Sequence, residues 1–283
     1  HSDHRRQRQM CIRDRTYPYL LPCLIASVLS AGSLVLAYFK LPESLKLDPS
    51  TRSVDERPAA QRLGGLLRTS ARMLGTPSIG AMIWVSMLFI FGFTVMHSVF
   101  ILYTEMDASS GGLGFSERDN GRIFAAIGLL GILTQGVLIG PLTRRFGTRR
   151  LIPISIMVTG LGLTLIPYTQ ANMAWIQMLV VVSCIAVGNG IFQPSSSTYL
   201  TRIAREEGYD LGVVMGAQES LTAFARIFGP LSGGLVWELT VGGSYPFDYH
   251  TSFHLCGLLM VISAALTLRL PHLAEIEEQE LAT

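Results

Sequence analysis

The sequence predicts an all-α protein, a polytopic transmembrane helix bundle with about seven spans. Hydrophobic residues make up 49% of the 283 positions and charged residues only 15%, whereas soluble domains carry roughly 25% charged residues. The apolar residues fall in blocks of about 20, the length that spans the hydrocarbon core of a bilayer. A β-sheet does not compete with this prediction, because an open sheet edge cannot lie in lipid.

Apolar blocks divide the chain into a series of predicted spans. They are residues 17–39, 79–103, 121–142, 150–168, 174–200, 211–237 and 252–270. The last six form a predicted bundle over residues 79–270. Residues 1–16 are basic and differ in composition from the apolar block after them, so we expect a non-native or disordered lead-in. Residues 271–283 are expected to form a tail.

Lys and Arg residues predict the orientation of these helices. They concentrate in the loops 40–78, 143–150 and 201–210, whereas the intervening loops contain only Arg118. Positive loops face the cytoplasm, which places the C-terminus there and predicts a multi-pass protein of the cell membrane. The second part of loop 40–78 has apolar residues at helical spacing. It is predicted to be an amphipathic helix, either on the membrane surface or in a solvated linker.

Several classes of protein do not fit the sequence. The net charge of +2 is too small to indicate nucleic-acid binding, and the four cysteines form no C-x-x-C pair. No phosphate-binding loop, zinc-protease motif or nucleophile elbow occurs, so no enzyme is predicted. His250 and His254 are four residues apart, a spacing that could bind a metal, but the sequence suggests no third ligand beyond Asp248. We therefore predict no metal site.

A glycine- and arginine-rich turn comes after the third span and reads GPLTRRFGTRR from Gly140 to Arg150. Gly140 and Gly147 are expected to permit a tight turn. Its arginines either contact helix ends and anionic lipid or act as ordinary cytoplasmic anchors. The turn resembles the cytoplasmic-loop motif G-x-L-x-D-R-x-G-R-R of the major facilitator superfamily. The matching residues are Gly140, Leu142, Arg145, Gly147 and Arg149, whereas Arg144 and Thr148 depart from the motif.

The sixth span carries a second motif. It is similar to the antiporter motif G-x-x-x-G-P-x-x-G-G of the same superfamily, with alanine in the first place. The matching residues are Ala225, Gly229, Pro230, Gly233 and Gly234. Glycines four apart also allow neighbouring helices to approach closely, either in a moving bundle or in static packing.

The resemblance implies the second half of a twelve-helix major facilitator fold. Residues 17–39 would then be helix six, 40–78 the central linker, and 79–270 the C-terminal six-helix bundle. The nearest resemblance is to the bacterial drug-exporter branch that includes tetracycline exporters. It implies alternating access powered by a proton gradient, with no cofactor. The implied partners are a small-molecule substrate, protons, the lipid bilayer and the missing N-terminal half.

Polar residues within the spans are the candidate site. Glu219 and His97 are candidates for proton coupling, although Glu219 could simply meet water or an arginine at the cytoplasmic end. Arg226 lies seven residues after Glu219, about 10 Å along the helix axis, so no direct pair is expected unless both side chains reach along the helix. The candidates for the substrate cavity are Thr94, Gln135, Asn189, Gln193 and Arg226. The alternative for each uncharged residue is an interhelical hydrogen bond.

These features predict a secondary active transporter, with proton-coupled export of a small amphipathic molecule as its activity. One alternative is proton-coupled uptake of a small metabolite. The other is a transport-inactive half-transporter that serves as a membrane sensor or scaffold.

Overall fold

The computed structural model describes residues 20–40, 68, 71–169, 173–245 and 247–271. The chain divides into two units, His1–Arg57 and Pro58–Thr283, and each is considered by itself. The predicted lead-in, most of the linker and nearly all of the tail lie outside the described residues.

The described part of the first unit is one helix, α2, from Leu20 to Lys40. Its 21 residues match the predicted span 17–39, and the side chains described along it are exposed. Ser27 is one of its few polar residues, and its hydroxyl donates to the carbonyl of Cys23 at 2.7 Å. The Ser27 hydroxyl is thus satisfied by the backbone of its own helix.

The second unit is built from helices, without a strand among its described residues. Its main elements are α4 (Ile79–Glu105), α5 (Glu117–Leu133), the π-helix η3 (Thr134–Leu138), α6 (Ile139–Phe146), α7 (Thr148–Leu165), α8 (Ala174–Glu206), α9 (Leu211–Thr240) and α10 (His250–Leu266). Short 3₁₀ turns occupy Ala108–Ser110, Ile166–Tyr168 and Thr267–Arg269. The fold class predicted from the sequence is confirmed.

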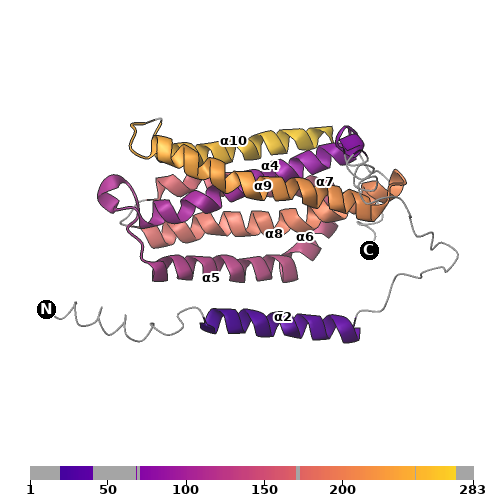
Figure 1. Cartoon of the computed structure of the whole chain (residues 1–283), viewed down its shortest axis with the longest axis horizontal. Helices are drawn as coiled ribbons and strands as arrows, with labels where there is room; N and C mark the ends of the chain where they lie inside the picture. The colour runs from indigo at the N-terminus through magenta and orange to yellow at the C-terminus, as the bar shows by residue number, and fades with distance from the viewer. Residues whose placement is uncertain (1–19, 41–67, 69–70, 170–172, 246, 272–283) are drawn as a thin grey trace. The chain divides into compact units, whose positions relative to one another are not determined.

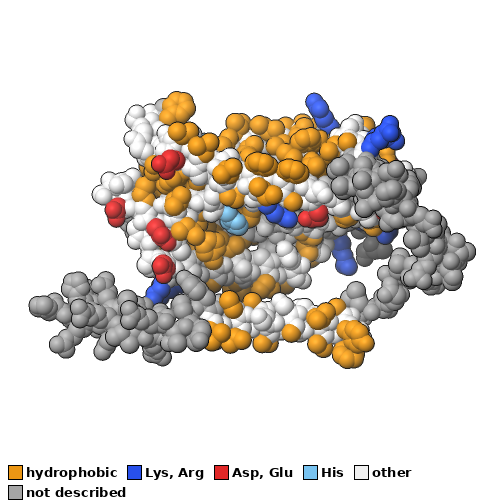
Figure 2. Space-filling view, in the orientation of Figure 1, with side chains coloured by type: hydrophobic (Ala, Val, Ile, Leu, Met, Phe, Trp, Pro, Cys, Tyr) orange, Lys and Arg blue, Asp and Glu red, His pale blue; other side chains and the backbone are white. Residues whose placement is uncertain are grey.

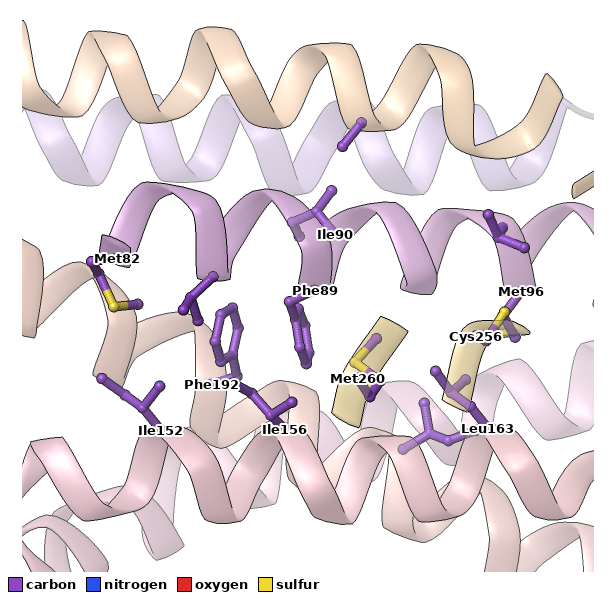
Figure 3. Packing of buried hydrophobic residues seen from close by; sticks show 14 of the residues in the cluster. Met82, Phe89, Ile90, Met96, Ile152, Ile156, Leu163, Phe192, Cys256 and Met260 are labelled. Atoms are coloured by element: carbon purple, nitrogen blue, oxygen red, sulfur yellow. The ribbon is translucent and has the colours of Figure 1, made fainter. Parts of the chain in front are cut away.

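Neighbouring helices of the second unit form a series (Figure 1). α9 packs on α4, α4 on α10, α10 on α7, α7 on α8, and α8 on α5. The core lies where α4, α7, α8 and α10 meet (Figure 3). There Phe89 of α4 stacks on Phe192 of α8 with ring centroids 3.8 Å apart. α5 and α9 are the two ends of the series, so each keeps a face that the described helices leave open.

Six helices in the described residues are long and apolar enough to cross a membrane. They cover Cys23–Lys40, Ile79–Glu105, Glu117–Phe146, Thr148–Tyr168, Trp175–Glu206 and His250–Arg269. The remaining predicted span, 211–237, is α9. This helix is 30 residues long, but Glu219, Arg226 and Glu238 make it less apolar than the others.

The turn predicted from Gly140 to Gly147 is wrong in its extent. Gly140 lies inside α6, and the helix continues to Phe146. Gly147 makes the turn alone, with φ 73° and ψ 152°. Only this second glycine needs a backbone conformation that side chains disfavour. The span therefore runs farther than the predicted 121–142. It also starts earlier, at a capping box in which Ser116 and Asp119 bond each other's backbone amides.

Candidate functional site

α4 and α9 run parallel and touch along a line that we call the α4–α9 seam. Its contacts rise in step along both helices, from Ser86 opposite Gln218 to Thr94 opposite Ala225. The Thr94 hydroxyl lies 3.1 Å from the Ala225 carbonyl oxygen. A Cβ atom added at Gly229 would lie 2.0 Å from Thr94 Oγ1. The close approach of the two helices therefore depends on this glycine.

Three other residues of the antiporter-like motif, Pro230, Gly233 and Gly234, have different surroundings. Gly233 also faces α4, where an added Cβ would lie 2.3 Å from Ser98 Oγ. Gly234 has open space where its Cβ would be, and Pro230 is exposed. The motif thus has one packed side and one open side. Three glycines outside this motif are also open, since nothing lies within 4 Å of a Cβ added at Gly136, Gly140 or Gly216.

Glu219 and Arg226 form an ion pair on the open side of α9, because both side chains reach far enough to meet. Arg226 Nη1 lies 3.4 Å from Glu219 Oε2. Both side chains reach along the two helical turns that separate them. The Glu219 side chain remains 68% exposed and the Arg226 side chain 53% exposed. Figure 2 shows acidic, basic and histidine side chains in a row on this side, surrounded by hydrophobic groups.

His97 of α4 stands at the mouth of a small pocket. Its ring lies 4.7 Å from that of Phe93, and the residue is exposed. The pocket has a volume of about 40 Å³ and is lined by Phe93, Met96, His97, Phe100, Phe124, Ile127, Val182 and Ile185 of α4, α5 and α8. This space admits a methyl group or a ring edge. The aromatic lining could not be found from the sequence, because apolar residues in a span carry no mark of facing a pocket.

The predicted amides lie around η3 and α8. Gln135, in η3, and Gln193, in α8, are exposed. Asn189 is half-buried, and its Oδ1 atom is buried without a hydrogen-bond partner among the described residues. An added Cβ at Gly190 would lie 3.0 Å from Thr134 Cγ2, so η3 and α8 are in close contact. An unpaired buried carbonyl can receive a hydrogen bond from a solute or water.

Thr94 has a structural role. Its Oγ1 atom lies 2.9 Å and 3.0 Å from the carbonyl oxygens of Ile90 and Phe91, in addition to the contact with α9. This is the interhelical alternative that the sequence left open for the uncharged polar residues.

The cytoplasmic-loop motif separates into anchored and exposed residues. Arg149 Nη2 donates to the Leu270 carbonyl at 2.9 Å, which ties the start of α7 to the residue after the 3₁₀ turn Thr267–Arg269. Arg145 is exposed, and its guanidinium lies 5.6 Å from the centroid of the Phe146 ring. Leu142 is half-buried. Arg149 therefore has a structural role, because it joins two segments that are far apart in the sequence.

Comparison with known proteins identifies the family. The sequence pattern of the Major Facilitator Superfamily matches residues 108–281. The chain belongs to this superfamily. The resemblance to this superfamily inferred from the two motifs is therefore confirmed. The predictions of a multi-pass membrane protein and of no enzyme are confirmed with it.

Three relatives give the range of similarity within the superfamily. Multidrug resistance protein 1 of Bacillus subtilis is 26% identical over 212 residues, which cover 75% of this chain and 51% of that protein. Tetracycline resistance protein, class C, of Escherichia coli is 26% identical over 211 residues, 74% of this chain and 48% of its own length. A probable peptide/nitrate transporter of Arabidopsis thaliana is 26% identical over 239 residues, with coverages of 78% and 48%. The chain thus spans about half the length of these relatives.

Proposed function

We propose that this chain is part of a proton-coupled exporter of a small amphipathic molecule, which works by alternating access in the cell membrane with its C-terminus in the cytoplasm. The observation that carries the proposal is the Glu219–Arg226 pair on the open side of a long, mostly apolar helix. Charges within membrane helices are costly, and they are kept where they face water or a transport path. Similarity to proteins named for multidrug and tetracycline resistance supports export.

The weakness of the ion pair suits a coupling role. At 3.4 Å and with both side chains more than half exposed, the pair contributes about 0–1 kcal/mol where water reaches it. A proton on Glu219 would remove its charge and release Arg226. A proton and a substrate could therefore compete for the Glu219 carboxylate. A deeply buried pair would cost several kcal/mol to break and would not switch.

The neighbouring surface suits an amphipathic substrate. The small aromatic pocket beside His97 can receive an apolar group, while the amides of Gln135, Asn189 and Gln193 offer hydrogen bonds. The open faces of α5 and α9 are where the other half of the transporter would complete the cavity. A site that joins an apolar pocket to a few polar groups is typical of small-molecule binding.

A flux assay on the complete transporter tests the proposal. The protein is reconstituted in proteoliposomes, a pH gradient is imposed, and movement of a fluorescent amphipathic cation is followed. We expect Glu219→Gln to lower pH-driven flux about tenfold or more, because the substituted amide cannot carry the proton. Glu238→Gln, on the same helix and also exposed, is the control and should keep wild-type flux. Unchanged flux in Glu219→Gln would refute the coupling role.

Uptake is the second candidate, favoured by the similarity to a protein named as a probable peptide/nitrate transporter. The same liposomes separate the two directions. Substrate that moves in the same direction as the protons indicates proton-coupled uptake. Substrate that moves in the opposite direction indicates export in exchange for protons. A chain that moves nothing in either direction would fit a sensor or scaffold.

A further inference from the structure

A cluster of ring side chains lies at the end of the bundle where α10 begins, far from the Glu219–Arg226 pair along the helices. His250 and His254 stand one helical turn apart with ring centroids 5.9 Å from each other. Tyr168, from the turn after α7, completes the triangle at 5.1 Å from His250 and 5.9 Å from His254. The Tyr168 hydroxyl lies 2.9 Å from His254 Nε2. We call Tyr168, His250 and His254 the ring triad.

We propose that the ring triad binds a divalent first-row transition metal ion such as Zn²⁺. Imidazole nitrogen is the ligand that Zn²⁺, Cu²⁺ and Ni²⁺ prefer in proteins. Two histidines at positions i and i+4 of a helix present their nitrogens on one face, as in helical zinc motifs. No third His, Cys, Asp or Glu joins the two histidines in a metal-holding group among the described residues. The Tyr168 phenolate would therefore be the third ligand, and a water molecule the fourth. Three protein ligands and one open position is the arrangement of an accessible zinc site.

Asp248 prepares His250 for this role. His250 Nδ1 lies 2.9 Å from Asp248 Oδ1, and the same oxygen accepts the His250 backbone N–H at 2.9 Å. A carboxylate that holds the Nδ1 proton leaves the lone pair on Nε2 and makes that nitrogen a better ligand. The Asp248 and His250 side chains are only 12% and 14% exposed, so the arrangement is fixed by packing. Tyr249 stacks on His250 at 4.2 Å.

Tyr168 and His254 are already in contact, since Tyr168 Oη and His254 Nε2 lie 2.9 Å apart in a direct hydrogen bond. Two ligands bound tetrahedrally at 2.0–2.1 Å lie about 3.3 Å apart, so metal binding would move these two atoms apart by about 0.4 Å. A metal ion would take the place of the shared proton, and that proton would pass to solvent. Tyr168 is 50% exposed, which gives the ion a path from the surface. The site would link the end of α7 to the start of α10.

Zinc titration of the purified complete transporter tests this proposal. We expect one Zn²⁺ per chain and a rise in the thermal unfolding temperature, because an ion that binds only the folded state stabilises it. His250→Ala and His254→Ala should each weaken binding at least about tenfold, and Asp248→Asn about 10–100-fold. Co²⁺ bound in place of Zn²⁺ should give the visible absorption of a tetrahedral site, and the His250→Ala/His254→Ala double variant should lose it.

The controls separate the ring triad from other histidines. His97→Ala removes an exposed histidine on α4 and should leave the zinc affinity unchanged. His254→Gln keeps a group that can hydrogen-bond Tyr168, so it should unfold at the wild-type temperature without zinc and still bind zinc weakly. Equal zinc binding by the wild type and the double variant would overturn the proposal. The ion would then bind elsewhere in the complete protein.

Discussion

Two seams in the bundle use the same packing device in different surroundings. In the α4–α9 seam, an added Cβ at Gly229 would lie 2.0 Å from Thr94 Oγ1. Between α7 and α10, an added Cβ at Gly257 would lie 2.1 Å from Thr164 Oγ1. Each pair sets a glycine against a threonine hydroxyl, and small residues of this kind let membrane helices approach closely. Packing alone therefore does not distinguish the two seams.

The surfaces beside the seams do distinguish them. The α4–α9 seam is bordered by the Glu219–Arg226 pair and by His97. The α7–α10 seam is bordered by an apolar groove of about 350 Å³ lined by Met157, Gly160, Leu161, Thr164, His254, Gly257, Leu258, Met260 and Val261. Charged groups need water or partners, whereas an aliphatic groove is compatible with lipid chains. From the proposed function we therefore expect α9 to face a transport path and the α7–α10 seam to face the bilayer.

Gly229→Ala is expected to give the largest loss of stability. The new methyl group would overlap the Thr94 hydroxyl, and overpacking of this kind costs about 1–3 kcal/mol. The better helix propensity of alanine offsets about 0.5–1 kcal/mol of that cost. A net loss of about 1–2 kcal/mol in the free energy of unfolding should therefore be measured in detergent. Gly234→Ala is the matched control, because its methyl group would enter open space. Equal effects at the two positions would contradict the packing described for this seam.

Gly257→Ala extends the comparison to the other seam. Its methyl group would overlap Thr164 Oγ1, so we expect a similar loss of about 1–2 kcal/mol. The two variants should differ in transport. Gly229→Ala changes the seam beside the ion pair and should lower flux per folded molecule, whereas Gly257→Ala should not. Flux and folded fraction are measured on the same preparations, and equal flux losses would remove the distinction between the seams.

The helices could be predicted from the sequence because the thickness of the bilayer sets the length and the apolar composition of a segment that crosses it. The beginning of α2, α4 and α8 and the extent of α9 agree with the predictions to within a few residues. The turn at Gly140 could not be placed, because glycine is tolerated both in a helix and in a turn. The π-helix η3 was also missed, since nothing in the composition of residues 134–138 marks it.

Side-chain contacts were harder to predict than helices. Glu219 and Arg226 are about 10 Å apart along the axis, and only the conformations of two long side chains bring them to 3.4 Å. Tyr168 and His254 are 86 residues apart in the chain, so their contact depends on the packing of α7 against α10. The family could be inferred because its motifs are local, whereas the members of the ring triad are joined only by the fold.

Charge reversal at Arg226 tests the polar side of the comparison. Arg226→Glu would place two carboxylates where an ion pair stands, and we expect pH-driven flux to fall about tenfold, equivalent to about 1.4 kcal/mol. The double exchange Glu219→Arg/Arg226→Glu restores opposite charges and should recover part of the flux. Arg145→Glu, at an exposed position in the cytoplasmic-loop motif, serves as a charge-matched control for folding and insertion. If the double variant transports as poorly as Arg226→Glu, attraction between the two side chains is not what supports the flux.

The smallest expected effect compares the two threonines. Thr94→Val keeps the side-chain shape but removes the hydroxyl that lies 3.1 Å from the Ala225 carbonyl of the neighbouring helix. Interhelical hydrogen bonds in membrane proteins contribute about 0.6 kcal/mol on average, so the free energy of unfolding should fall by about that amount. Thr164 Oγ1 bonds the Gly160 carbonyl within its own helix at 2.8 Å, and Thr164→Val should therefore cost less. If the two variants are equally stable, the hydroxyl of Thr94 adds nothing between the helices. The close approach at Gly229 and Gly233 would then contribute more to the α4–α9 seam than this hydroxyl does.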